Sequence, residues 1–174
     1  MNQLKAVAGN LAFFLVLAGC ASGVTREGGA SKPAKLADPK VTAVRIYLNE
    51  AAQKLHGDNI KFNPEALRST VQRSLEARQL IAADAKQRMD IEITDMRVRS
   101  TFSSIAFGFM AGADSVKGNV HVLGADGRPV TKFEVSASYA LGGIGGGTDE
   151  TRLNWLYEEF AKLSINELLG IEAK

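Results

Sequence analysis

The residues of this chain that could do covalent chemistry begin with its single cysteine, Cys20. A thiol becomes a strong nucleophile once it loses its proton. The residues before it, Leu17, Ala18 and Gly19, are one apolar and two small side chains, and such residues let an extended backbone enter a protease cleft. The thiol of Cys20 is therefore the candidate nucleophile of this segment. A single cysteine also excludes an internal disulfide.

The segment before the cysteine has the pattern of an export signal. Lys5 supplies one positive charge, and residues 6–17 are apolar apart from Gly9 and Asn10. At about 1.5 Å per residue this run is too short to span a hydrocarbon core of about 30 Å. With Leu17–Cys20 it resembles the lipobox of bacterial lipoproteins. The resemblance implies that the signal peptide, residues 1–19, is removed and that acyl chains such as palmitate anchor Cys20 in a membrane.

The resemblance also implies a location. An Asp after the cysteine retains many such lipoproteins in the inner membrane, and this chain has Ala21 instead. We therefore expect an outer-membrane lipid anchor in the cell envelope, with the protein facing the periplasm and the inner membrane as the less favoured alternative. Residues 20–40 are rich in Gly, Ser, Ala, Pro and Lys and lack apolar periodicity. They predict a lipidated N-terminus and a flexible linker that reaches some 25 Å.

The other residues that could do chemistry do not form a recognisable constellation. His56 and His121, the two histidines, lack Cys, His or acidic ligands at metal-binding spacing. The glycine run 142–147 fails the G-x-G-x-x-G fingerprint, and Asp149 and Glu150 follow it where a phosphate would sit. Arg97, Arg99 and Lys117 are expected on the sheet surface rather than in an anion site. We therefore expect no enzyme activity, no cofactor and no metal.

Composition sets the broad class. The 174 residues carry a net charge of +2 and are 45% hydrophobic, which is typical of a globular protein. This balance of charge, without a basic face that contains aromatic residues, argues against binding to nucleic acid. Residues 41–174 predict a single domain.

Hydrophobic periodicity predicts the elements of that domain. Strands are expected over 41–48, 89–99, 116–123 and 130–140, and Met96 breaks the alternation of its strand. Helices are expected after the Asn63-Pro64 start signal and over 149–169. The order β-α-β-β-β-α predicts an α+β fold, with an antiparallel or mixed four-stranded sheet and two helices on one face.

An apolar segment over 102–115 lies between two of these strands and contains Phe102, Phe107, Phe109 and Met110. Phe107 and Phe109 share one strand parity, whereas Phe102 and Met110 share the other, so in an extended chain apolar side chains point both ways. The segment is therefore a core strand, an interface with a partner or a second copy, or a membrane-contacting segment.

The stretch from about Asp90 to Leu169 resembles domain-of-unknown-function family 4410, a group of bacterial lipoproteins. The likeness is carried by Ile91–Asp95, Gly108–Ala113, the Asp126-Gly127 hairpin and the glycine run. The resemblance implies an envelope location and a binding role, and it supplies no catalytic residues.

These features together predict a membrane-anchored envelope lipoprotein. We expect it to act as a non-enzymatic interaction or assembly module in the periplasm, with an envelope protein or a second copy as its partner. The alternative is an accessory lipoprotein of a transport system that binds a small molecule or a lipid. This alternative predicts an apolar pocket between the sheet and the helices.

Overall fold

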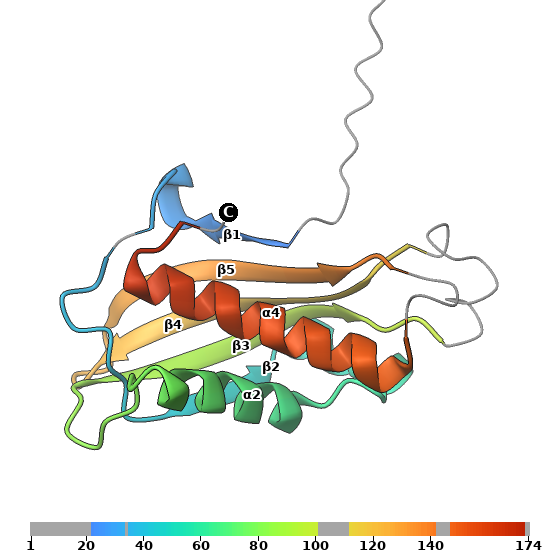
Figure 1. Cartoon of the computed structure of the whole chain (residues 1–174), viewed down its shortest axis with the longest axis horizontal. Helices are drawn as coiled ribbons and strands as arrows, with labels where there is room; N and C mark the ends of the chain where they lie inside the picture. The colour runs from blue at the N-terminus through green and yellow to red at the C-terminus, as the bar shows by residue number, and fades with distance from the viewer. Residues whose placement is uncertain (1–21, 34, 101–111, 142–146, 173–174) are drawn as a thin grey trace, which may run out of the picture.

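Figure 1 shows a computed structural model of the chain, which describes residues 22–33, 35–100, 112–141 and 147–172. A five-stranded sheet has the order β1-β5-β4-β3-β2. Its strands are β1 (Gly23–Arg26), β2 (Val44–Leu48), β3 (Gln87–Arg97), β4 (Asp114–Gly124) and β5 (Pro129–Tyr139). β2 runs parallel to β3 and the other neighbours are antiparallel, so the sheet is mixed.

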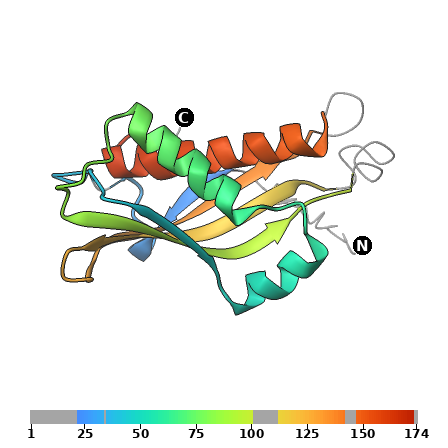
Figure 2. The same cartoon turned by 90° about the horizontal axis from the view of Figure 1, so that it is seen from below.

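Two helices cover one face of this sheet. α2 (Pro64–Ala77) and α4 (Asp149–Leu169) pack against each other on that face, whereas α1 (Glu50–Asp58) lies on the other side of the sheet, beyond the end of β2 (Figure 2). A short 3-10 turn, η1 (Glu27–Gly29), follows β1. The predicted α+β class with a mixed sheet is confirmed. The expected four strands and two helices are corrected to five strands and three α-helices within the described ranges.

The two additional elements come from segments with weak local signals. The predicted linker contains β1, whose Gly23 and Arg26 lie opposite Ser136 and Phe133 of β5, so the linker prediction is wrong for these residues. α1 begins at Asn49, whose side chain accepts a hydrogen bond from the Ala52 N–H at 2.8 Å. Its buried residue is Ala52 alone, so the segment has no apolar stripe that would have predicted a helix.

Several local predictions are confirmed. The strand register shifts between Ile93 and Asp95, so the broken alternation at Met96 did mark a bulge. Asn63 caps α2 through the Ala66 N–H at 3.1 Å. Gly127 has φ +77° between β4 and β5, the left-handed conformation that favours glycine in a hairpin turn.

The core lies between the sheet and the layer formed by α2 and α4. It is built from alternate residues of the three long strands and from one face of each helix. Its members include Met89, Ile91, Ile93, Val116, Val120, Val122, Phe133, Val135, Leu67, Val71, Leu75, Leu156, Phe160 and Leu168. Phe160 packs over Gly118 of β4, where a Cβ atom would lie 3.4 Å from its Cζ and 2.9 Å from the Glu92 carbonyl oxygen. Glycine at this position lets the helix and the neighbouring strand approach closely.

Candidate functional site: a buried polar network at one end of the sheet

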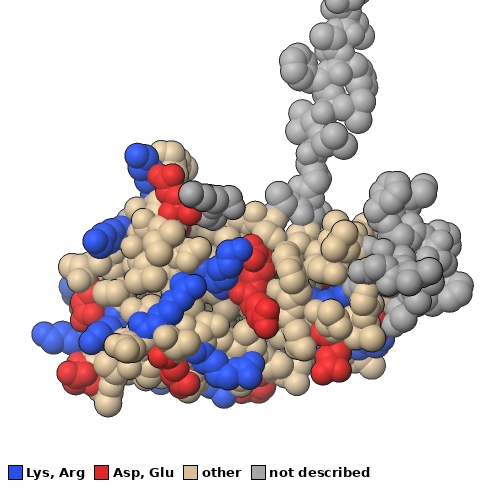
Figure 3. All heavy atoms as spheres, viewed as in Figure 1, with Lys and Arg blue, Asp and Glu red and all other residues tan. Residues whose placement is uncertain are grey.

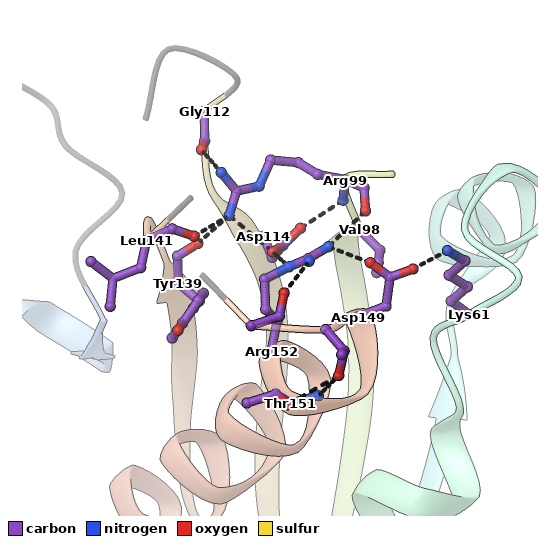
Figure 4. A network of polar contacts seen from close by, with 12 residues as sticks. Lys61, Val98, Arg99, Gly112, Asp114, Tyr139, Leu141, Asp149, Thr151 and Arg152 are labelled. Carbon is purple, nitrogen blue, oxygen red and sulfur yellow. Dashed lines mark hydrogen bonds and ion pairs between the residues drawn. The ribbon is translucent and has the colours of Figure 1, made fainter. Parts of the chain in front are cut away.

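Four parts of the chain meet at one end of the sheet around a buried carboxylate (Figure 4). Asp114 begins β4, Arg99 follows the end of β3, Tyr139 ends β5, and Arg152 lies in the first turn of α4. The side chains of Asp114, Arg99 and Arg152 are only 1%, 2% and 1% exposed. Ion pairs at this depth are strongly coupled because little water screens them.

Asp114 receives hydrogen bonds on both carboxylate oxygens. The backbone N–H of Arg99 donates to Oδ1 at 2.6 Å. Oδ2 accepts from Nη2 of Arg99 at 3.0 Å and from Nε of Arg152 at 2.6 Å. One carboxylate therefore pairs with two guanidinium groups and ties β3, β4 and α4 together.

Arg99 also fixes the backbone on either side of the site. Its Nη1 donates to the Gly112 carbonyl at 2.7 Å, and its Nη2 lies 3.2 Å from the Tyr139 carbonyl and 3.0 Å from the Leu141 carbonyl. Gly112 is the residue at which the chain returns to β4, and Leu141 is where it leaves β5. The same guanidinium therefore holds the described end points of the segments 101–111 and 142–146.

Arg152 extends the network to the start of α4 and to the α1–α2 connection. Its Nη2 donates to the Arg99 carbonyl at 3.0 Å and to Oδ1 of Asp149 at 2.7 Å, and Asp149 in turn pairs with Lys61. Thr148 caps the helix by accepting from the Thr151 N–H at 3.2 Å. The cap sets the first turn, so that Asp149 and Arg152 lie on one side of α4 and face the sheet.

Reasoning from the sequence did not find this network. Arg99 was expected on the sheet surface, but it is buried because it lies beyond the end of β3, where its guanidinium pairs with Asp114. One signal was available for Arg152, because it lies four residues before Leu156 and eight before Phe160, on the buried stripe of the helix. An arginine at such a position indicates a buried acidic partner. The sequence spacing gave no sign that the partner is Asp114, which lies 38 residues away.

The predicted site residues fall mostly outside the described ranges. These are Gly19 and Cys20 at the signal boundary, and Phe102, Phe107, Phe109 and Met110 of the apolar segment. The two histidines have separate surroundings: His56 Nε2 lies 2.9 Å from the Phe62 carbonyl oxygen, and His121 lies opposite Asp90 in the sheet.

Two further features concern metal and membrane. Within residues 22–172, leaving out the gaps named above, no group of three or more His, Cys, Asp or Glu side chains could hold a metal ion. No helix in the described part of the chain has the length and apolar character to cross a bilayer.

Two surface hollows border the network. One, of about 130 Å³, is lined by residues 58–61 and 98–100, and it is smaller than the about 300 Å³ of an ordinary ligand pocket. The other, of about 370 Å³, opens between Lys61 and α4 and includes Tyr157. Burial raises the pKa of the Tyr157 phenol, so the hydroxyl stays neutral and accepts the Asn63 N–H at 2.8 Å. Neither hollow lies between the sheet and the helix layer.

The family model described as "Domain of unknown function (DUF4410)" matches residues 30–143, which is more than half of the chain. The chain belongs to this family, and the resemblance found from the sequence is confirmed. The match begins farther toward the N-terminus than the likeness from Asp90 and ends at the glycine run.

Comparison with curated proteins finds no match. Among solved structures, the chain is similar to a PelC dodecamer from Paraburkholderia phytofirmans, with 14% identity, a TM-score of 0.49, and coverage of 88% of this chain and 100% of that one. It is also similar to a protein of family model DUF330 from Xanthomonas campestris, with 14% identity, a TM-score of 0.37, and coverage of 79% and 90%. Both likenesses are too distant to assign a function.

Proposed function

We propose that this chain is a non-enzymatic envelope lipoprotein that is anchored through Cys20 and faces the periplasm, and that it binds a protein partner at the end of its sheet. The outer membrane is the location favoured by Ala21. The anchor rests on the sequence pattern of residues 1–20. The binding role rests on the buried network of Arg99, Asp114 and Arg152.

The network supports a binding role because of what it holds in place. Arg99 contacts Gly112, which follows the segment 101–111, and Leu141, which precedes the segment 142–146. Arg152 lies 3.4 Å from the carbonyl of Gly147, which follows the second segment. Chain segments whose flanking residues are held by a rigid scaffold are well suited to recognition, since the scaffold bears part of the ordering cost of binding. The longer segment contains Phe102, Phe107, Phe109 and Met110, the side-chain types that form the centre of protein interfaces. The partner is an envelope protein or a second copy of this chain.

The anchor is tested by labelling growing cells with radioactive palmitate. We expect the wild type to incorporate label and to fractionate with the outer membrane, and Cys20→Ala to lose both properties because the acyl acceptor is gone. Ser22→Ala is a matched control, since it leaves the thiol in place two residues away. If the wild type and Cys20→Ala both showed only background labelling, the lipoprotein assignment would be refuted.

The binding surface is tested with Phe109→Glu in the full-length lipidated protein. A buried apolar contact cannot accept a carboxylate without a large desolvation cost. We therefore expect the wild type to give crosslinked complexes in intact cells or oligomers on sedimentation in detergent, and Phe109→Glu to give neither.

The control is Val130→Glu, at the other end of β5, where the side chain is 50% exposed. It should leave complexes and oligomers unchanged. If Phe109→Glu retains every complex of the wild type while keeping its thermal stability, the proposed surface is wrong.

A further inference from the structure

The chain enters the folded domain two residues after Cys20. Ser22 is held by Ser138, whose N–H donates to the Ser22 Oγ at 3.0 Å and whose carbonyl accepts from it at 3.3 Å. Gly23 then begins β1 opposite Ser136 of β5. Two peptide units span at most about 7 Å. A lipid carried by Cys20 would therefore attach at the surface of the domain and not at the end of a long linker.

The entry point is rigid because β1 is joined to both the sheet and α4. Arg26 donates from Nε and Nη2 to the two carboxylate oxygens of Glu167, each at 2.7 Å. The Glu167 side chain is 7% exposed, so this bidentate pair is shielded from solvent and geometrically well defined. The side of the molecule that faces outward beside Ser22 is therefore determined by the fold.

That side presents the outer strip of α4, which we define as Trp155, Glu159, Lys162 and Asn166. Steps of four, three and four residues place them along one helix face. Three of the four line a hollow of about 380 Å³ together with Ser22 and Ile171. The strip therefore runs directly beside the point where the chain enters β1.

Aromatic and aliphatic side chains are exposed along this side. The rings of Trp155 and Tyr139 lie 5.1 Å apart, and Tyr139 follows Ser138, the residue that holds Ser22. Trp155 is 38%, Leu141 63% and Ile171 49% exposed. Tryptophan and tyrosine favour the lipid–water boundary, because an apolar ring and a polar edge suit its two sides.

Most of the charges beside these apolar groups are paired, and Glu172, which lines the same hollow, adds one acidic group. Glu159 and Lys162 of the strip pair at 2.8 Å, and Arg26 and Glu167 neutralise each other. Figure 3, viewed as Figure 1, shows acidic and basic residues intermingled on this side of the molecule and not gathered in a patch of one sign. No large electrostatic repulsion therefore opposes close approach to an anionic bilayer.

From this placement we infer that the outer strip of α4, with Tyr139 and Leu141, lies against the bilayer that holds the Cys20 anchor. This inference rests on the proposed lipidation. Trp155 sits at the lipid–water boundary, and the domain has one fixed orientation. β2, at the opposite edge of the sheet from β1, faces away from the membrane.

The test uses Trp155 as a probe, since it is the only tryptophan of the chain. Full-length lipidated protein is reconstituted into vesicles of phosphatidylethanolamine and phosphatidylglycerol, with and without a brominated phosphatidylcholine that quenches nearby indoles. We expect tryptophan emission to shift to shorter wavelength on reconstitution and to fall when the brominated lipid is present.

The matched control moves the tryptophan to the other edge of the sheet in the double variant Trp155→Phe, Tyr47→Trp. Tyr47 lies in β2 and is 46% exposed. The double variant should float with the vesicles, but its tryptophan emission should neither shift to shorter wavelength nor be quenched by the brominated lipid. Equal quenching of both proteins would overturn a fixed orientation.

Flotation separates this inference from the anchor. A wild-type protein that floats with the vesicles, but whose Trp155 is not quenched, overturns the membrane-facing strip and leaves lipidation intact. A protein that neither takes up palmitate nor floats overturns the proposed function itself.

Discussion

Asp114→Ala should destabilise the domain by about 3–5 kcal/mol, because it leaves two buried guanidinium groups without the carboxylate that both contact. Domains of this size are stable by about 5–15 kcal/mol, so the loss is a large fraction of the total. The change in the free energy of unfolding is measured by urea unfolding of the non-lipidated Cys20→Ala protein, with and without the Asp114 substitution. Asp114→Asn keeps an oxygen acceptor and should cost less than Asp114→Ala.

The control for this substitution is Asp126→Ala in the β4–β5 hairpin. Asp126 also pairs with an arginine, Arg128, at 3.6 Å, but the two side chains are 61% and 87% exposed. Exposed pairs contribute at most about 1 kcal/mol. An equal shift of the urea midpoint for Asp114→Ala and Asp126→Ala would show that the network does not hold the end of the sheet together.

Phe160→Ala should cost a similar amount, about 3–5 kcal/mol, for a different reason. Phe160 is completely buried and packs over Gly118 in the middle of the layer between α4 and the sheet. Because Gly118 has no side chain to fill the space, the truncated residue leaves a cavity that the strand cannot close. We expect a lower urea midpoint and an unchanged m-value, the slope of the unfolding free energy against urea concentration.

Glu158→Ala, on the exposed side of the same helix, tests whether the loss comes from packing. Its effect should stay within about 0.5 kcal/mol, as for most surface substitutions. If Phe160→Ala proved as mild as Glu158→Ala, the layer between α4 and β4 would not be the main core of the domain. Phe160→Leu should lie between the two, since it restores part of the lost volume.

The apolar layer and the buried polar network have different roles in the domain. The apolar layer around Phe160 supplies the burial that makes the domain fold. The buried polar network fixes the geometry at one end of the sheet, where the segments 101–111 and 142–146 begin. At the β1 edge of the sheet, the chain enters the domain shortly after Cys20. The proposed binding surface and the proposed membrane-facing strip thus meet near Tyr139 and Leu141.

The sequence alone predicted most elements of the fold for reasons that are local. The alternation of Ile91 and Ile93 followed by a break at Met96 predicted a strand with a bulge, because side chains alternate across a pleated strand. Asn63 and Pro64 predicted a helix start, because they satisfy and shape its first turn. Asp126-Gly127 predicted a hairpin, because the left-handed conformation of its turn favours glycine.

The tertiary structure alone decided what depends on contacts between distant residues. Gly23–Arg26 becomes a strand because β5 offers an unpaired edge and the Glu167 carboxylate pairs with Arg26. Val24 and Thr25 are β-branched and suit a strand, but two such residues do not predict one by themselves. Arg99 becomes buried because the Asp114 carboxylate, which also pairs with Arg152, compensates its charge, and Asp114 lies 15 residues away in the sequence. Local periodicity reports what one segment can do by itself, whereas edge pairing and buried ion pairs arise only when the chain brings such segments together.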